Sequence, residues 1–170
     1  MKELVDRPEY LNQLILNKDI DLVKIVSGIR RAGKSSILDL FHQHLLDTGI
    51  PEANIIHMNL ESLRYRDLTD YLTFYEYVSE RISHNGRTYL IFDELQTVEH
   101  WEKAIESFRI DFDVDIYITG SNAYLLSSEF STLLAGRYIE IRVLPLSFKE
   151  FLTFYEFNPE ISIEEKFQKY

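Results

Sequence analysis

The chain has 170 residues, of which 45% are hydrophobic and 27% charged, a composition typical of one globular domain with an apolar core. Its formal net charge of −10 comes from 18 basic and 28 acidic residues and argues against general nucleic-acid binding by this segment. The absence of cysteine excludes disulfides, zinc–thiolate sites and cysteine nucleophiles. A cysteine-free chain suits the cytoplasm, so we expect a cytoplasmic location. No apolar stretch is long enough to span a membrane, and residues 1–10 contain no apolar signal core.

Short apolar runs alternate with longer stretches of helical spacing, which predicts an α/β fold around a parallel sheet. Strands are predicted over residues 22–26, 54–60, 88–92, 114–119 and 138–144. Helices are predicted over residues 36–46, 68–83, 101–108 and 123–134, and again after residue 147. Three Ser/Thr-x-x-Glu patterns, at residues 73–76, 147–150 and 162–165, are interpreted as helix-capping boxes.

A phosphate-binding loop follows the first predicted strand. Residues 28–35, GIRRAGKS, fit the pattern G-x-x-x-x-G-K-[ST], whose glycines let backbone N–H groups turn toward phosphate oxygens. Lys34 is expected to contact the β- and γ-phosphates, and the Ser35 hydroxyl to ligate Mg²⁺. Arg30 and Arg31 either add charge beside the phosphates or are solvated or ion-paired. The predicted nucleotide-binding residues are Gly28, Ile29, Arg30, Arg31, Ala32, Gly33, Lys34, Ser35 and Ser36.

Two carboxylates follow the apolar strand over residues 88–92. Asp93 is expected to hold Mg²⁺, and Glu94 to act as the general base for an attacking water. Gln96 lies close enough in sequence to Glu94 to sense the nucleotide state. No N-K-x-D base-reading motif follows the loop, so ATP is favoured over GTP. We therefore predict ATP hydrolysis; the alternatives are an ATP-binding switch with negligible hydrolysis and a phosphotransferase with a small-molecule acceptor.

Other polar residues are candidates for a supporting role. Ser121 and Asn122 follow the fourth predicted strand and either contact the attacking water or γ-phosphate, or form a simple strand-to-helix turn. Asn59 either holds Glu94 through its amide when ATP is absent, or only forms a turn. Arg137 either stabilises transition-state charge, in its own site or a neighbouring subunit's, or is a plain surface arginine.

The sequence resembles the AAA+ branch of P-loop ATPases, and most of all the ATPase domain of predicted bacterial and archaeal ATPases that usually carry a C-terminal domain of unknown function. The resemblance is carried by SGIRRAGKSS, YLIFDELQTVEHWEKAIESF, DIYITGSNAYLLSSEFSTLLAGRYIEI and VLPLSFKEFLTFYEF, which run in the family's order and cover most of residues 27–157. It implies a three-layer α/β/α P-loop NTPase fold with a five-stranded parallel sheet of order 5-1-4-3-2.

The same resemblance implies roles for individual residues and an organisation for the chain. Walker A falls at residues 28–35, and Walker B at Asp93 with catalytic Glu94. A sensor-1 role falls at residues 121–122, a glutamate-switch role at Asn59 and an arginine finger at Arg137. No helical lid with a sensor-2 arginine follows the fifth strand. We expect an ATPase domain over residues 1–157, and at 158–170 the start of a linker to a downstream domain. A homo-oligomer would follow if Arg137 acts on a neighbouring subunit.

Overall fold

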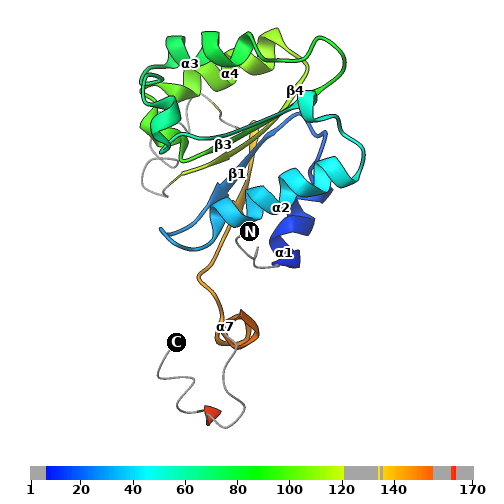
Figure 1. The fold of residues 1–170 in the computed structure, drawn as a ribbon, viewed down its shortest axis with the longest axis vertical. Helices are drawn as coiled ribbons and strands as arrows, with labels where there is room; N and C mark the ends of the chain where they lie inside the picture. Colours follow the sequence, from blue (N-terminus) through cyan, green and yellow to red (C-terminus); the bar gives the residue numbers. More distant parts are fainter. Residues whose placement is uncertain (1–6, 121–133, 135, 155–161, 164–170) are drawn as a thin grey trace.

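The computed structural model describes residues 7–120, 134, 136–154 and 162–163, which contain a five-stranded sheet. Its strands are β1 (Val23–Ser27), β2 (Ile55–Asn59), β3 (Thr88–Asp93), β4 (Val114–Thr119) and β5 (Tyr138–Arg142). Every neighbouring pair is parallel, and the strand order is β2-β3-β4-β1-β5 (Figure 1). This is the order 5-1-4-3-2 counted from the other edge, so the predicted sheet is confirmed.

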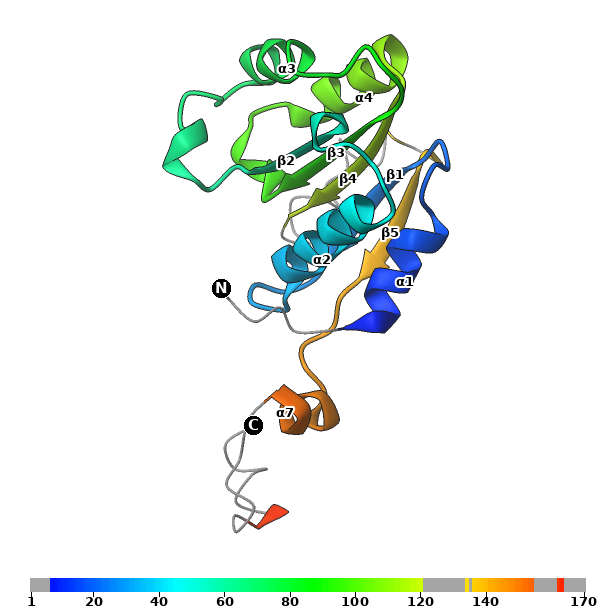
Figure 2. The ribbon, with the colours of Figure 1, turned by 45° about the vertical axis from the view of Figure 1, so that its right-hand side comes forward.

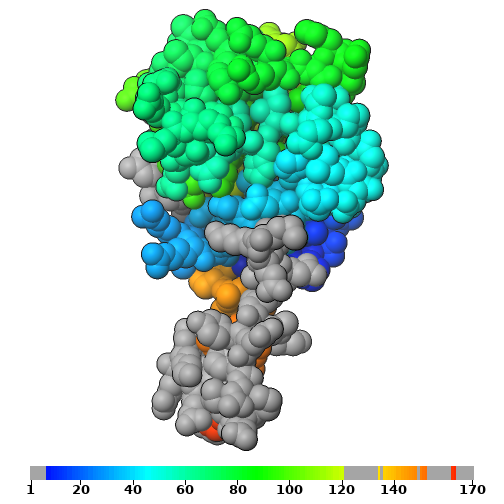
Figure 3. Space-filling model, in the orientation of Figure 1, coloured from blue at the N-terminus to red at the C-terminus, as the bar shows by residue number. Residues whose placement is uncertain are grey.

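Helices cover both faces of the sheet and give three layers (Figures 1 and 2). One face carries α1 (Pro8–Leu16) and α2 (Lys34–Asp47), and the other carries α3 (Tyr71–Ser79) and α4 (Trp101–Asp111). Three single 3₁₀ turns, η1 (Glu52–Asn54), η2 (Leu63–Tyr65) and η3 (Leu95–Thr97), lie in the connections. After β5 the chain forms α7 (Phe148–Phe154) away from the sheet (Figures 1 and 2). In the space-filling view the segment that follows β5 emerges at the lower side of the rounded body (Figure 3).

The central strands are buried on both faces because a helix layer covers each face. All six residues of β3 are buried, as its continuous apolar run predicts. Leu90 and Phe92 point to one side, where the Phe92 ring lies 4.9 Å from that of Phe74 on α3. Ile91 points to the other side, into the core that Phe41 of α2 helps to fill. The alternation follows from the two-residue period of a strand and produces two separate apolar cores.

Helix boundaries differ from the predictions at two places. Helix α1 was not predicted, although Pro8 occupies its first turn, where proline is well tolerated. Helix α3 begins at Tyr71 because the Asp70 carboxylate accepts hydrogen bonds from the N–H groups of Leu72 and Thr73. The predicted capping box that starts at Thr73 is therefore wrong, since Thr73 already lies inside the first turn.

The second predicted capping box, at residues 147–150, is confirmed. The Ser147 N–H donates to Glu150 Oε2 at 2.7 Å, and the Glu150 N–H donates to the Ser147 hydroxyl at 3.2 Å. The predicted helix over 123–134 and the box at 162–165 extend into residues that the structure does not describe. Among the helices it does describe, none is both long and apolar enough to cross a membrane.

Candidate functional site

The polar residues singled out from the sequence gather where parallel strands end together. The loop over residues 28–33 joins the end of β1 to the start of α2. Strand register places Asp93, the last residue of β3, beside Asn59, the last residue of β2. Thr119 ends β4, and register pairs it with Val26 near the end of β1. The carboxyl ends of these strands thus bring the loop, Asp93, Asn59 and Thr119 to one edge, where α/β sheets bind ligands.

The loop has the tightly curled backbone that a phosphate-binding loop needs. Gly28 has a φ of 153°, and an added Cβ there would lie 2.5 Å from the carbonyl oxygen of Val143. Arg31 and Gly33 also have positive φ angles, of 68° and 91°. Gly33 occupies the N-cap position of α2 and has no side chain with which to cap that helix. The first N–H groups of α2, at Lys34 and the residues after it, form an end of positive charge suited to an anion.

Lys34 lies between this loop and the acidic pair. Its side chain is almost fully buried, and its ammonium donates to the carbonyls of Gly28 at 3.2 Å and Ile29 at 3.3 Å. The ammonium is also 4.0 Å from Glu94 Oε1. Ser35 follows in the first turn of α2 and is exposed. The Lys34 ammonium thus contacts both the loop and the carboxylate, as expected of a group that would exchange these contacts for phosphate oxygens.

Asp93 is 2% exposed and hydrogen-bonded from two sides. It accepts from the Thr119 hydroxyl at 2.5 Å and from the Asn59 amide at 2.9 Å, which satisfies a carboxylate that burial would otherwise destabilise. The Thr119 hydroxyl also accepts from the Glu94 N–H at 3.0 Å. Thr119 therefore ties both acidic residues to β4. It was not singled out from the sequence, although a polar residue ending an apolar strand was a visible signal.

The backbone of Glu94 adopts a conformation that residues other than glycine rarely take. Its φ of 55° lies in the left-handed region and carries a cost of roughly 1–3 kcal/mol. Its carboxylate accepts a hydrogen bond of 2.5 Å from the Gln96 amide. The expected contact between Asn59 and Glu94 is corrected by the structure: strand register puts Asn59 beside Asp93, and Gln96 is the amide donor to Glu94.

Arg137 lies at the amino-terminal ends of the strands, whereas the phosphate loop lies at their carboxyl ends. Its carbonyl accepts from the N–H of Val23, the first residue of β1, whereas the loop follows the last residue of that five-residue strand. The separation is about 17 Å along the strand. Its guanidinium is 57% exposed and pairs with Glu106 of α4 at 2.5 Å. Arg137 therefore does not serve the loop of its own chain, and a role in a neighbouring subunit stays a prediction.

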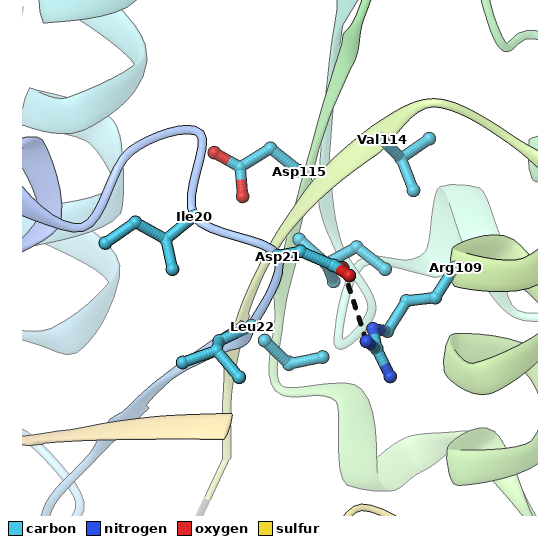
Figure 4. Close-up of a pocket in the computed structure, with 8 residues that line it drawn as sticks. Ile20, Asp21, Leu22, Arg109, Val114 and Asp115 are labelled. Carbon is cyan, nitrogen blue, oxygen red and sulfur yellow. Dashed lines mark hydrogen bonds and ion pairs between the residues drawn. The ribbon is translucent and has the colours of Figure 1, made fainter. Parts of the chain in front are cut away.

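A small pocket opens at that same distant edge, between the start of β4 and the segment before β1 (Figure 4). On one side Arg109 pairs with Asp21 at 3.3 Å. On another lies Asp115, which binds the fully buried ammonium of Lys24 at 2.5 Å. Burial lowers the pKa of Lys24, and Asp115 opposes that shift. Since β1 separates this cluster from the loop, we interpret it as a structural ion-pair cluster.

The remaining predicted residues divide by exposure and by what the structure describes. Arg30 and Arg31 are exposed, which fits either version of their role. Ser121 and Asn122 lie outside the described residues. In the part of the chain that is described, no three His, Asp or Glu side chains form a metal cluster. The Ser35 hydroxyl and Asp93 carboxylate are oxygen donors of the kind Mg²⁺ prefers, and its other ligands would be phosphates and water.

Comparison with known proteins identifies a family. A family model described as an AAA domain matches residues 21–152. The chain is 46% identical over 152 residues to an uncharacterized protein of Haemophilus influenzae, covering 89% of this chain and 38% of that protein. It is 35% identical over 152 residues to the uncharacterized protein MJ1544 of Methanocaldococcus jannaschii, covering 85% and 32%. The chain thus spans less than two fifths of the length of these relatives.

Solved structures agree on the fold. The closed state of Hsp104 with ATPγS and FITC casein matches with a TM-score of 0.61 at 15% identity, over 88% of this chain and 28% of that one. AMPPCP-bound DnaA from Aquifex aeolicus matches with a TM-score of 0.56 at 14% identity, over 94% and 53%. At these identities the likeness concerns the fold alone.

Proposed function

The chain belongs to the AAA domain family of P-loop ATPases, and we propose that it binds ATP with Mg²⁺ at the phosphate loop and hydrolyses it. The observation that carries the proposal is the position of Lys34, whose ammonium lies 3.2 Å from the Gly28 carbonyl and 4.0 Å from Glu94. A phosphate chain entering the loop meets a cation on one side and a carboxylate on the other. The first group stabilises developing phosphate charge, and the second accepts a proton from water.

Each residue at the site has a definite task in this proposal. Lys34 exchanges its two carbonyl partners for oxygens of the β- and γ-phosphates, while the N–H groups at the start of α2 bind the same anion. Ser35 and Asp93 would hold Mg²⁺, which neutralises phosphate charge when bound. Thr119 and Asn59 fix the Asp93 carboxylate, so it needs no reorientation when the nucleotide arrives. Glu94 accepts the proton of the attacking water.

The contact between Gln96 and Glu94 supports a second candidate, an ATP-binding switch with little intrinsic hydrolysis. A carboxylate that accepts from an amide at 2.5 Å and lies 4.0 Å from Lys34 is less free to turn toward an attacking water. In this version ATP binds and changes the site, and turnover begins only when a partner frees Glu94. A phosphotransferase with a small-molecule acceptor has no comparable observation in its favour.

The surroundings of the domain follow from the same proposal. The relatives from Haemophilus and Methanocaldococcus extend well beyond the matched region, which supports our proposal that the whole protein carries a further domain. Arg137 at the far edge of the sheet would reach only a neighbouring subunit's nucleotide, so a role for it requires a homo-oligomer. Mixing Arg137→Ala subunits with Lys34→Ala subunits tests this. Recovery of activity in the mixture supports shared sites, and no recovery contradicts them.

Calorimetric titration of ATP and GTP, with and without Mg²⁺, tests nucleotide binding. We expect ATP to bind in preference to GTP, Mg²⁺ to strengthen binding, and Lys34→Ala to weaken it by roughly 30- to 100-fold, since a charged hydrogen-bonding group is lost. Lys103→Ala is the matched control, because Lys103 is an exposed lysine of α4 on the other face of the sheet. Equal affinities for wild type and Lys34→Ala would contradict the proposed site.

Phosphate release from ATP tests hydrolysis separately. Glu94→Gln keeps the size of the side chain and the nucleotide contacts but removes the proton acceptor. We expect unchanged ATP affinity and a turnover lower by about 10²- to 10⁴-fold. If wild type binds ATP tightly but shows no turnover at saturating concentration, the switch module replaces the ATPase as the preferred function.

A further inference from the structure

Arg7 is a buried arginine that connects three segments far apart in the sequence. Its side chain is 4% exposed. Nη1 donates to the carbonyl of Ala32 in the phosphate loop and to the carbonyl of Leu144 after β5, each at 2.9 Å. Nε donates to Glu150 of α7 at 2.9 Å, and the guanidinium lies 4.5 Å from the centre of the Tyr10 ring. A buried guanidinium needs such partners, and here they belong to the loop, to the segment after β5 and to α7.

The loop and the segment after β5 also touch directly. The Val143 N–H donates to the Ser27 carbonyl at 2.7 Å, one residue before the loop begins. The Val143 carbonyl oxygen would lie only 2.5 Å from a Cβ added to Gly28. The Leu144 N–H donates to the Tyr10 hydroxyl at 3.2 Å, so α1 holds the same segment from the other side. Residues 143–144 are therefore packed between the phosphate loop and α1.

Glu150 links this arrangement to the start of α7. Its carboxylate accepts from Arg7 and from both the N–H and hydroxyl of Ser147, the capping box of the helix. Partial burial raises the pKa of Glu150, but the hydrogen bonds from Ser147 and Arg7 outweigh it and hold the pKa below its usual value. The carboxylate stays ionised and paired with Arg7 at neutral pH. Arg7 thus holds a residue in the first turn of α7, which begins at Phe148.

We propose that Arg7 is a positioning residue for the phosphate loop, and that it couples the shape of this loop to the position of α7. The rigid, planar guanidinium of Arg7 donates hydrogen bonds to the Ala32 carbonyl, the Leu144 carbonyl and Glu150, and so fixes their relative positions. The inference rests on the proposed nucleotide site for its functional consequence, because a loop held in shape binds phosphate without first having to be ordered.

The coupling runs in both directions. If fixing α7 through Glu150 strengthens nucleotide binding at the loop, then a bound nucleotide must stabilise the Arg7–Glu150 contact by the same factor. Any domain that follows α7 in the chain would be connected to the nucleotide through this one side chain and the backbone at residues 143–144. The proposed coupling would therefore let a bound nucleotide change the position of α7 and of any domain that follows it.

Two measurements on Arg7→Ala test the proposal, one of which needs no nucleotide. The first is amide hydrogen exchange over residues 28–33 and 143–151 in the nucleotide-free protein. We expect faster exchange in both segments at once, because Arg7 holds both. The second is ATP affinity by calorimetry, where we expect a loss of about 5- to 50-fold, the range typical of coupling between sites. Glu150→Gln should give a smaller loss, and its effect should largely vanish when Arg7→Ala is already present.

Two control variants separate positioning from general loss of stability. Arg87→Ala also removes a guanidinium, one that donates to the Asp113 carboxylate and to the backbone carbonyl of Asp19 and pairs with the Asp19 carboxylate at 3.5 Å. Arg87 lies at the opposite ends of the strands from the phosphate loop. Ser147→Ala removes the cap of α7 and keeps the Arg7 contact. We expect both to leave exchange over residues 28–33 and ATP affinity unchanged within about twofold.

Each outcome decides between the two proposals. If wild type binds ATP, Lys34→Ala does not, and Arg7→Ala matches wild type in affinity and loop exchange, the nucleotide site stands and the role of Arg7 is refuted. If wild type binds no ATP, the nucleotide site fails, and hydrogen exchange alone decides about Arg7. Faster exchange in both segments then supports the positioning role of Arg7, and unchanged exchange over the loop overturns it. A loss of affinity in Arg87→Ala equal to that in Arg7→Ala also counts against it.

Discussion

Gly28→Ala should destabilise the fold and weaken nucleotide binding, because the position has no room for a methyl group. An added Cβ would lie 2.5 Å from the carbonyl oxygen of Val143, well inside van der Waals contact. Val143 cannot move away freely, since its N–H donates to the Ser27 carbonyl at 2.7 Å. The φ of Gly28 is 153°, which alanine adopts only with strain.

The magnitude follows from these two effects. Forcing a methyl group into a packed site costs about 1–3 kcal/mol, and holding alanine in an unfavourable backbone region costs about 1–3 kcal/mol. We therefore expect Gly28→Ala to lower the free energy of unfolding by about 2–6 kcal/mol. Gly49→Ala is the matched control, because Gly49 also has a positive φ, of 89°, but nothing lies within 4 Å of its added Cβ. The control should show only the backbone cost, about 1–2 kcal/mol.

Urea denaturation of wild type, Gly28→Ala and Gly49→Ala measures the difference, provided that each unfolds in a single transition. Gly28→Ala should be the less stable variant by about 1–3 kcal/mol, the part due to the clash with Val143. ATP titration of the same proteins should show weakened binding for Gly28→Ala alone. Equal stability of the two variants would refute the reasoning, because it would mean that the segment after β5 does not press on the phosphate loop.

Three further predictions concern other parts of the molecule. Gln96→Ala should raise basal ATP turnover by about tenfold at unchanged ATP affinity, since it frees Glu94 from a 2.5 Å hydrogen bond; unchanged turnover contradicts this. Phe74→Ala should lower the free energy of unfolding in urea by about 3–5 kcal/mol, because the ring is fully buried; a loss below 1 kcal/mol contradicts that packing. Burial lowers the pKa of His57, whose Nδ1 lies 3.0 Å from His42 Nδ1. The folded state therefore favours the neutral imidazole, so the stability that His57 contributes is complete above pH 6.5 and is lost as the pH falls below that value. His57→Gln should flatten the stability profile below pH 6.5, and an unchanged slope would show that another group titrates there.

The sheet could be predicted from the sequence because its strands are short apolar runs that end in polar residues. The run before Asp93 is buried on both faces, as such a run requires. The phosphate loop could be predicted because its geometry is local: glycines at fixed spacing produce the curled backbone, and Lys34 follows directly. Helix α1 was missed although its signals were present, with Pro8 in its first turn and apolar residues at 10, 11, 14 and 15.

Contacts between distant segments could not be predicted in this way. The partner of Asn59 depends on strand register, which pairs it with Asp93, and no local pattern distinguishes that carboxylate from its neighbour Glu94. The spacing of Thr73 and Glu76 predicts a cap at Thr73, but the Asp70 carboxylate, one turn earlier, is the acceptor that caps the helix. Arg7 gave no signal at all, because its partners lie 25, 137 and 143 residues away.

The phosphate loop is contacted from two sides, and the contacts on the two sides would respond differently to a bound nucleotide. On the side of β3, Lys34 is 4.0 Å from Glu94, a contact that a phosphate chain would replace. On the side of β5, Arg7 and Val143 contact the loop through its backbone, at Ala32 and Gly28, which a nucleotide would leave in place. A change in the Lys34–Glu94 contact therefore depends on the chemical state of the nucleotide. A shift of the loop backbone, in contrast, must move residues 143–144 or strain against them. Since α7 begins only four residues after Leu144, the coupling proposed for Arg7 would act through this second side.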